Sequence, residues 1–154
     1  MKIYADTNFY TNLILQLSHG ADARTLYDQH RANAEHPIPI TPLLELEFLN
    51  AIERYVFESR HGGQWRVTPE GAMVASSAFD GFIEVHVDFE QRALSFAALK
   101  VFFELMVPRH TAKWGFRTYD ILHVASALAL GCDTFWTFDT KARKLAKLEG
   151  LATN

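Results

Sequence analysis

The sequence predicts an α/β fold in which helices flank a mainly parallel sheet. Short apolar runs typical of β-strands alternate along the chain with longer stretches of helical periodicity. Two of these runs end directly in an aspartate, Asp6 and Asp139. The 154 residues contain no internal repeat, low-complexity stretch or linker, so we expect a single domain over residues 1–154.

The first elements follow this alternation closely. Residues 2–5 are short and apolar, as a buried strand is, and the apolar side chains that follow recur at helical spacing as far as Leu17. The stretch 22–34 mixes polar and apolar residues and predicts a second helix. Prolines within 36–40 exclude a helix there, because each biases its predecessor toward extended geometry, and favour a short strand.

The middle of the chain predicts two helices. Thr41-Pro42 places a hydroxyl cap before a proline in the first turn, and apolar residues at helical spacing extend this helix to about Ser59. Thr68-Pro69 opens a second helix, which we expect to reach Glu84. The alternation over 85–88 then indicates a strand.

The last third returns to shorter elements. Its apolar periodicity predicts helices over 89–106 and 118–130, separated by a loop at 108–115 that is rich in positive charge and hydroxyl groups. Three further elements are expected to close the fold: a strand at 135–138, a helix at 141–149 and a final strand at 151–152.

Composition excludes several classes of protein. Apolar residues make up 49% and charged residues 21% of the chain, which is close to the globular average. The single cysteine, Cys132, rules out an internal disulfide and a four-cysteine zinc site, and is more typical of a small buried residue than of a nucleophile. No apolar run is long enough to span a membrane and no signal peptide is evident, so we expect a cytoplasmic protein.

The charge is unevenly distributed. Lys plus Arg total 15 and Asp plus Glu total 18, a net charge of −3 that argues against a strongly basic protein that coats nucleic acid. Residues 1–99 carry 7 basic and 13 acidic side chains, whereas residues 100–154 carry 8 basic and 5 acidic ones. The excess of positive charge in the last third indicates either an anionic partner or simply a solvated face.

Acidic residues occur at the positions where a parallel α/β sheet usually binds its ligands. Asp6 and Asp139 each follow a strand, and ligand sites of open parallel sheets lie beyond the carboxyl ends of the strands. Asp120 falls in the first turn of an apolar helix, and Glu47 lies among apolar neighbours, where an unpaired carboxylate is costly. Carboxylates that converge in this way form a hard-oxygen site suited to Mg²⁺ or Mn²⁺ and not to zinc.

Each acid also has a purely structural interpretation. Asp120 favours the positive end of a helix dipole, and Asp139 is well placed to cap the last helix. Glu45, close to Glu47 on the same helix, is expected to face solvent. His123 lies three residues after Asp120 and therefore on the same helix face, where it is either a hydrogen-bonded buried histidine or a group that orients an acid or touches substrate.

Motifs of other enzyme classes are absent: the sequence has no glycine-rich phosphate loop, no GxSxG and no HExxH. Several fragments, in order, instead resemble the PIN domain family and, within it, the VapC-type toxins of bacterial toxin–antitoxin pairs. The resemblance covers nearly the whole chain and is carried by Tyr4-Ala5-Asp6-Thr7-Asn8-Phe9, Thr41-Pro42-Leu43, Leu46-Glu47-Phe48-Leu49-Asn50-Ala51, Arg109-His110-Thr111, Gly115 through Ala125, and Thr137-Phe138-Asp139.

This resemblance implies a PIN-like three-layer sandwich and a Mg²⁺- or Mn²⁺-dependent endoribonuclease. The four acids of the family correspond here to Asp6, Glu47, Asp120 and Asp139. Glu47 is preferred to Glu45 because Asn50-Ala51 follows it at nearly the family's spacing. Asn8 and Thr137 resemble the polar residues that support the acids, and Arg117 and His123 recur in the toxin subgroup without an assigned role.

The expected chemistry is metal-assisted phosphodiester hydrolysis, in which one or two ions activate water and stabilise charge on phosphoryl oxygens. Asp6 and Asp120 are expected to be the main metal ligands. Asp139 is expected to bind the metal directly or through water, and Glu47 to hold a metal-associated water or act as general base.

The basic segment before Asp120 is the candidate for substrate binding. Arg109, Lys113 and Arg117 are suited to phosphates, and Trp114 between them to stacking an unpaired base. The alternative is an exposed basic loop with Trp114 in the core. That the substrate is RNA, such as tRNA or rRNA, follows from the resemblance alone.

The resemblance also implies partners: a cognate antitoxin that inhibits the enzyme, and a second copy in a homodimer. Aromatic residues of the helical stretches were candidates for the antitoxin groove and equally for the core: Phe48, Tyr55, Phe57, Phe79 and Phe82. A non-cleaving PIN-like module that binds RNA or protein is the alternative function. A phosphatase is disfavoured because Asn8 stands where a second acid is usual, and a flap-type nuclease would need a longer chain.

Overall fold

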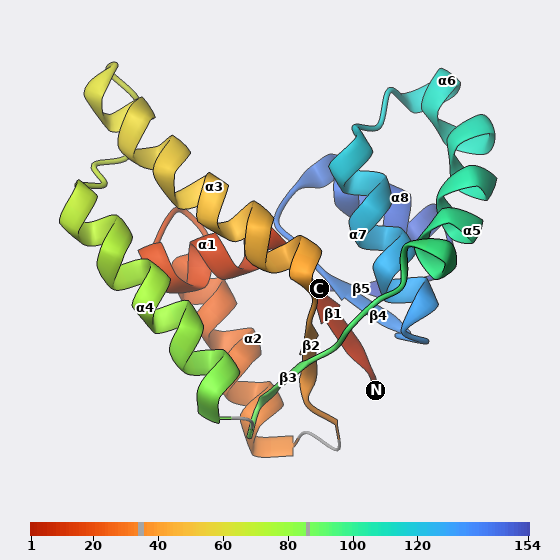
Figure 1. Ribbon diagram of the computed structural model, residues 1–154, viewed down its shortest axis with the longest axis horizontal. Coiled ribbons are helices and arrows are strands. Elements are labelled where there is room, and N and C mark those ends of the chain that lie inside the picture. Colours follow the sequence, from red (N-terminus) through yellow and green to blue (C-terminus); the bar gives the residue numbers. More distant parts are fainter. Residues whose placement is uncertain (34–35, 86) are drawn as a thin grey trace.

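The computed structural model describes residues 1–33, 36–85 and 87–154. In this part of the chain the strands pair only in parallel, in a ladder of order β1-β4-β5 and a second ladder of β2 with β3 (Figure 1). β2 lies beside β1, so the two ladders form one central layer. The strands are β1 (Ile3–Ala5), β2 (Ile38–Ile40), β3 (Phe89–Gln91), β4 (Thr134–Trp136) and β5 (Ala152–Thr153).

Helices cover both sides of this layer (Figure 1). On one side lie α1 (Thr7–Leu15), α2 (Gly20–Asn33), α3 (Pro42–Arg60) and α4 (Pro69–Val85). On the other lie α5 (Phe96–Met106), the π-helical turn η1 (Val107–Thr111), α6 (Ala112–Trp114), α7 (Thr118–Ala129) and α8 (Thr140–Leu148). The expected α/β fold with a parallel sheet flanked by helices is therefore confirmed.

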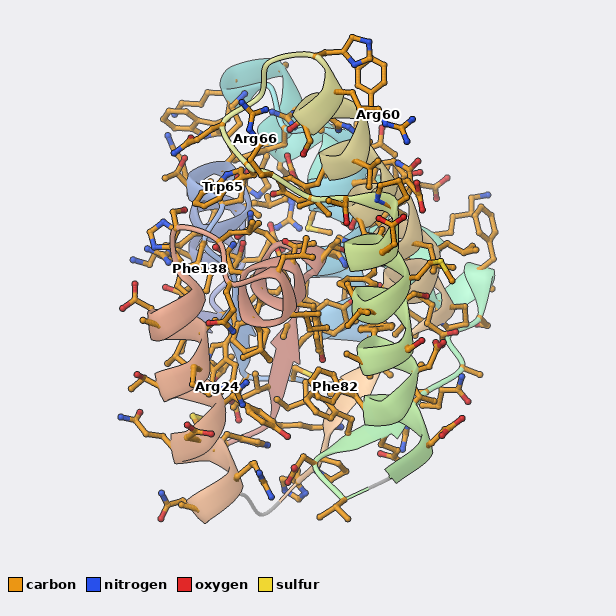
Figure 2. All side chains as sticks on the ribbon, turned by 90° about the vertical axis from the view of Figure 1, so that its left-hand side faces the viewer. Arg24, Arg60, Trp65, Arg66, Phe82 and Phe138 are labelled. Atoms are coloured by element: carbon orange, nitrogen blue, oxygen red, sulfur yellow. The ribbon has the colours of Figure 1, made fainter. Side chains whose placement is uncertain are left out.

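The two sides of the sheet have separate hydrophobic cores. Beneath α1–α4, Phe48 of α3 and Phe79 of α4 are fully buried and stack with ring centroids 4.3 Å apart. Seen from the side of α2 and α4, α1 lies between these two helices, and Phe82 points inward from α4 (Figure 2). Beneath α5–α8, Tyr4 of β1 stacks on Phe135 of β4.

These contacts decide between the two roles that the sequence leaves open for the aromatic residues. Phe48 and Phe79 are core residues and do not form a groove for a partner, because packing against each other leaves almost none of their surface exposed. Phe57, one turn before the end of α3, is the exposed member of that set.

Strand β3 differs from the sequence prediction. A strand was expected over 85–88 and a helix from residue 89. The structure continues α4 to Val85 and begins the strand at Phe89, where burial of this side chain against Tyr10 and Tyr27 favours pairing with β2. Helix α5 begins only at Phe96. Ser95 is its N-cap, and its hydroxyl accepts a hydrogen bond from the Ala98 amide at 3.1 Å. Residue 86 and the predicted helix end at 34 lie outside the described residues.

The segment 108–115 is not the expected loop. It continues the helix beyond α5 as η1 and α6, and it ends at Gly115, whose φ of +64° is the left-handed conformation that glycine adopts readily. Pro108 has no N–H to donate to the α-helical hydrogen-bond pattern. At this point the helix widens into a π-helical turn and does not end. In the part of the chain that is described, no helix combines the length and apolar character needed to cross a membrane.

Candidate active site

The four acids that the sequence singled out line one cleft. It has a volume of about 410 Å³ and lies where β1 and β4 end, with α3 and α7 on its walls. Its acidic residues come from four separate segments of the chain: Asp6, Glu47, Asp120 and Asp139. The sheet topology explains the meeting, because parallel pairing of β1 with β4 brings their carboxyl ends to the same edge.

Asp6 is fixed by both its main chain and its side chain. Its amide donates to the carbonyl of Trp136 at 3.1 Å, which extends the β1–β4 pairing by one residue. Its carboxylate Oδ1 accepts from the amide of Phe9 at 3.0 Å, so Asp6 is the N-cap of α1. Only 5% of the residue is exposed. Burial raises the pKa of Asp6 to about 6, while the electrostatic influence of the nearby His123 and a hydrogen bond from Thr137 oppose the rise.

The strand predicted at 135–138 is β4 at Thr134–Trp136, so Asp139 stands three residues after its end, whereas Asp6 follows β1 directly. Oδ1 of Asp139 accepts from the amides of Lys141 at 2.7 Å and Ala142 at 3.0 Å, which caps α8. Its own amide donates to Oγ1 of Thr137 at 3.0 Å. The predicted supporting residue Thr137 is fully buried. Because its side chain also hydrogen-bonds to the carboxylate of Asp6, it links the two aspartates.

Asp120 stands on the opposite wall, at the start of α7. Its Oδ2 accepts from the amide of Arg117 at 3.0 Å, as in one half of a capping box. Burial raises the pKa of Asp120, the bond from Arg117 lowers it, and the negative charge of Asp139 raises it further. Asp120 and Asp139 thus repel each other within the cleft, which is the situation that a bound cation relieves.

In all three aspartates one carboxylate oxygen accepts from a backbone amide at a helix N-terminus, and the other oxygen makes no hydrogen bond to that helix. The structural interpretation of Asp120 and Asp139 as helix-capping acids is therefore correct, but it does not compete with a role in the cleft. Capping fixes the direction of each carboxylate, and a fixed carboxylate binds a ligand with less loss of conformational freedom.

Glu47 belongs to a chain of polar contacts that runs into the core. Its Oε2 accepts hydrogen bonds from Nε2 of His123 and from the hydroxyl of Thr7. Nδ1 of His123 lies 2.9 Å from the hydroxyl of Tyr4, which is also 3.4 Å from Oγ1 of Thr41. Because a carboxylate only accepts, these contacts place a proton on Nε2 of His123 and let Tyr4 donate to Nδ1.

This chain of contacts is shielded from water. His123 is 3% exposed and Tyr4 is completely buried. Burial would raise the pKa of Glu47, but the hydrogen bonds from His123 and Thr7 outweigh it and hold the pKa below its usual range. Glu47 is therefore a charged, oriented carboxylate at neutral pH.

The neighbouring Glu45 lies elsewhere. Its Oε1 accepts from Nε2 of Gln91 at 3.1 Å, at the exposed end of β3, and it does not line the cleft. Asn8 does line it, and its Oδ1 accepts from the amide of Phe138 at 3.0 Å, which ties the start of α1 to the segment after β4.

Of the three predicted phosphate-binding cations, only Arg117 lines the cleft. Arg109 is not among the lining residues, and its Nη2 lies 3.1 Å from Oε2 of Glu149. Lys113 lies over the ring of Trp114, with Nζ 4.9 Å from the ring centroid. Trp114 itself is 38% exposed, so its expected alternative place in the core is wrong.

Several residues of the site were not predicted from the sequence. Arg54, Asn50 and Tyr119 line the cleft, and Tyr4 and Thr7 hold the contacts of His123 and Glu47. The positions of Arg54 and Asn50 were predictable, because they follow Glu47 by seven and three residues and therefore lie on the same helix face. The role of Tyr4 was not, since a tyrosine in an apolar strand is indistinguishable from a core residue.

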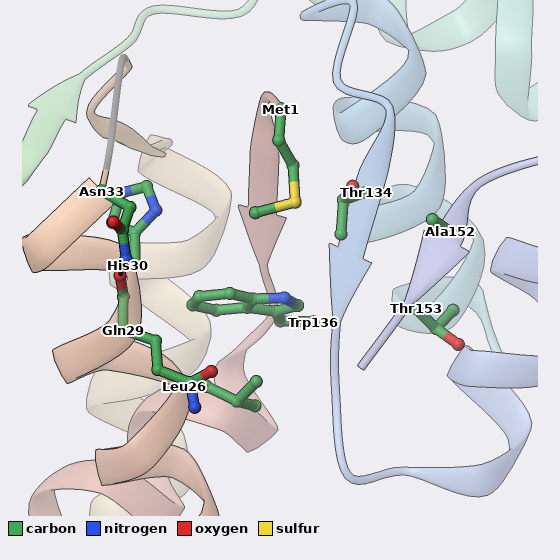
Figure 3. A pocket seen from close by; sticks show the side chains of 9 residues that line it. All are labelled: Met1, Leu26, Gln29, His30, Asn33, Thr134, Trp136, Ala152 and Thr153. Atoms are coloured by element: carbon green, nitrogen blue, oxygen red, sulfur yellow. Dashed lines mark hydrogen bonds between the residues drawn. The ribbon is translucent and has the colours of Figure 1, made fainter.

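A larger cavity of about 530 Å³ lies between α2 and strands β4 and β5 (Figure 3). His30 and Trp136 are among its lining residues, and none of the lining residues that the structure describes is acidic. The groups with perturbed pKa that converge on one another are in the smaller cleft, which we therefore take as the candidate active site.

Comparison with solved structures identifies the fold. One chain of the VapBC2 complex of Rickettsia felis, crystallised with a DNA fragment from the promoter, matches with a TM-score of 0.65 over 100% of this chain and 98% of its own. VapC20 of Mycobacterium tuberculosis, described as a sarcin–ricin loop cleaving toxin, matches with a TM-score of 0.64 over 93% and 94%. This chain has the VapC fold.

Both structures are 15% identical to this chain in sequence. No family model matches the sequence, and no curated protein does. The arrangement of elements therefore confirms the VapC-type PIN fold, with its three-layer architecture, that the sequence motifs predict.

Proposed function

We propose that this chain is a VapC-type toxin: a metal-dependent endoribonuclease that cleaves structured RNA such as tRNA or rRNA in the cytoplasm and is inhibited by a cognate antitoxin. The observation that carries the proposal is the meeting of Asp6, Glu47, Asp120 and Asp139 in one cleft of a VapC fold. The description of VapC20 as a toxin that cleaves the sarcin–ricin loop supports RNA as the substrate. The VapBC2 complex supports an antitoxin as partner.

The donor set fits Mg²⁺ or Mn²⁺. All four candidate ligands are carboxylates, the hard oxygen donors that these ions prefer. Burial raises the pKa of Asp6 and of Asp120, so their charged forms are costly in the cleft and a bound cation would offset that cost. Among residues 1–33, 36–85 and 87–154, no three His, Cys, Asp or Glu side chains already stand in a metal-binding arrangement. Binding of one or two ions would therefore draw the carboxylates together.

Each carboxylate has a role that its contacts define. Asp6, Asp120 and Asp139 would hold the ion, each oriented by the helix that it caps. A bound divalent ion supplies a Lewis acid that activates water and offsets the charge of the scissile phosphate. Glu47 is suited to orient water as a hydrogen-bond acceptor. Its low pKa disfavours a role as general base, because an efficient base has a pKa near the working pH.

Two cations at the rim complete the cleft. Arg54 on α3 and Arg117 before α7 both line it, on walls that also carry Glu47 and Asp120. Arginine binds phosphate through paired N–H donors, so these side chains are suited to the phosphates next to the cleavage point. They would hold the substrate in place while the carboxylates act on the bond.

The test is cleavage of total tRNA and rRNA by purified protein with Mg²⁺, Mn²⁺ or EDTA, beside Asp6→Asn and Asp120→Asn. Discrete fragments that require the metal and disappear in both variants are expected. Absence of cleavage together with absence of metal binding would contradict the proposal and leave the alternative of a non-cleaving module that binds RNA or protein.

A further inference from the structure

Positive side chains gather on α8 and on the turn that joins α6 to α7. Helix α8 carries four basic residues and no acidic one. Together with the turn it presents a set of exposed residues, here called the α8 basic surface: Lys113, Trp114, Arg117, Lys141, Lys144 and Lys147.

Trp114 organises this surface. Nζ of Lys144 lies 3.1 Å from the centroid of its ring, and Nζ of Lys113 lies 4.9 Å from it. Lys141 reaches the same turn, where its Nζ donates to the carbonyl of Gly115 at 3.5 Å. The aromatic ring thus keeps two ammonium groups near each other by cation–π attraction, although like charges repel.

The charge of the surface is not neutralised. Within the described residues, none of its five cations has a carboxylate oxygen within 4 Å. The nearby Arg109 is different, because Glu149 binds both Arg109 and His110. Beside the surface lies a shallow hollow of about 350 Å³, to whose lining Lys144 and Lys147 contribute. Positive side chains around an uncompensated hollow are suited to a polyanion.

The surface begins at the candidate active site. Helix α8 starts directly after Asp139, and Arg117 lines the cleft itself. From Asp139 to Lys147 the helix advances about 12 Å at its usual rise of 1.5 Å per residue. A polyanion with one phosphate in the cleft can therefore continue along α8 without leaving the protein.

We propose that the α8 basic surface binds single-stranded RNA next to the phosphate held in the cleft, with its lysines on phosphates and Trp114 beneath an unpaired base. This inference rests on the proposed ribonuclease function. A single strand is favoured over a duplex because an exposed indole contributes binding only to a base whose face is free. When an unpaired base stacks on Trp114, Lys144 leaves the indole ring and binds a phosphate of the RNA.

The experiment measures binding of a short, fluorescently labelled single-stranded oligoribonucleotide by anisotropy, in EDTA so that no strand is cut, over a range of KCl concentrations. In Lys144→Ala/Lys147→Ala, the slope of log K against log salt is expected to fall by about 1.4, since each lost phosphate contact on a single strand removes about 0.7. Trp114→Ala is expected to weaken binding with little change in slope, and Trp114→Phe to restore part of it.

Lys100→Ala is the matched control, because Lys100 is an exposed lysine on α5 that pairs with Glu104 and does not belong to the α8 basic surface. It is expected to bind RNA like the wild type. Thermal unfolding by circular dichroism checks that each variant is folded.

The outcomes separate this inference from the proposed function. Weaker binding by the lysine and tryptophan variants, together with absence of metal-dependent cleavage by the wild type, would support the surface and contradict the nuclease. Cleavage and binding that are unchanged in both variants would contradict RNA binding by the α8 basic surface and leave the proposed nuclease function intact. Equal binding of a duplex of the same length, or of polyglutamate, through the same lysines would overturn it too, because the surface would then attract anions without selecting a single strand.

Discussion

His123 and Glu47 are joined across the candidate active site by a hydrogen bond between Nε2 and Oε2, although 76 residues separate them in the sequence. The bond connects α7 to α3, the two walls of the cleft. On its other side His123 contacts the buried hydroxyl of Tyr4. The orientation of a carboxylate in the cleft is thereby determined from within the core.

The first prediction concerns His123. His123→Ala leaves Oε2 of Glu47 without its histidine donor and the buried Tyr4 hydroxyl without its acceptor, so we expect a loss of about 1–3 kcal/mol in the free energy of unfolding. We also expect kcat for RNA cleavage to fall more than KM rises, because Glu47 loses its orientation and the cations proposed to bind phosphate do not change. Urea denaturation and steady-state kinetics measure the two effects.

His123→Gln is the matched comparison, since a glutamine amide can still donate to Glu47. It is expected to recover part of kcat. Equal kcat in the alanine variant and the wild type would show that the contact has no role in catalysis.

The second prediction concerns Asp6 in metal-free protein. Its pKa is raised from 3.8 to about 6, so the folded state keeps this proton to higher pH than the unfolded state does. Its contribution to stability is therefore present below about pH 4 and is lost as the pH rises through 6. Asp6→Asn keeps a good N-cap and removes the buried charge, so at pH 7.5 in EDTA we expect it to be more stable than the wild type, by up to about 3 kcal/mol.

Urea unfolding at pH 4 and at pH 7.5 tests this prediction. The advantage of the asparagine variant should shrink at the lower pH, where the wild-type carboxyl is protonated in the folded state. A variant that is less stable than the wild type at pH 7.5 in EDTA would show that the charge of Asp6 is compensated within the protein.

The third prediction separates Glu47 from Glu45. Mn²⁺ at a hundredfold excess over its Kd is expected to stabilise the wild type by about 2.7 kcal/mol, which thermal unfolding detects as a higher Tm. Glu47→Gln should reduce this gain, because Glu47 lines the cleft, whereas Glu45→Gln should leave it unchanged. If the two variants respond alike, Glu47 has no specific part in metal binding, which contradicts the prediction.

The fourth prediction separates the two functions of Asp139. Asn caps helices about as well as Asp, so Asp139→Asn should retain the stability of α8 but lose most RNA cleavage. Asp139→Ala should lose cleavage and, in addition, about 1 kcal/mol of stability. Full activity of the asparagine variant would mean that Asp139 serves only as a cap.

The clustering of the aspartates was predictable because their places next to strands and helices can be recognised in the sequence. An aspartate directly after an apolar strand must lie at a strand end, and the parallel order of β1 and β4 then brings Asp6 and Asp139 together. The spacing from Asp120 to His123 likewise placed both on one face of α7, and both line the cleft.

Other features depended on contacts that no local pattern encodes. Arg109 looked like a phosphate ligand until the fold placed Glu149 beside it. The strand at Phe89 was hidden because three residues are too few to show alternation, and its place is set by burial against Tyr10 and Tyr27. The hydrogen bond from Tyr4 to His123 joins residues 119 positions apart, which only the tertiary structure reveals.

The central claim is that the carboxylates of this cleft bind a divalent cation for catalysis. The most direct measurement is a crystal structure of the protein grown with Mn²⁺, with anomalous diffraction used to locate the ion. The account predicts an anomalous peak in the cleft, within coordination distance of the Asp6, Asp120 and Asp139 carboxylates. A Mn²⁺-soaked crystal with an empty cleft, or with the ion bound only elsewhere on the protein, would contradict it.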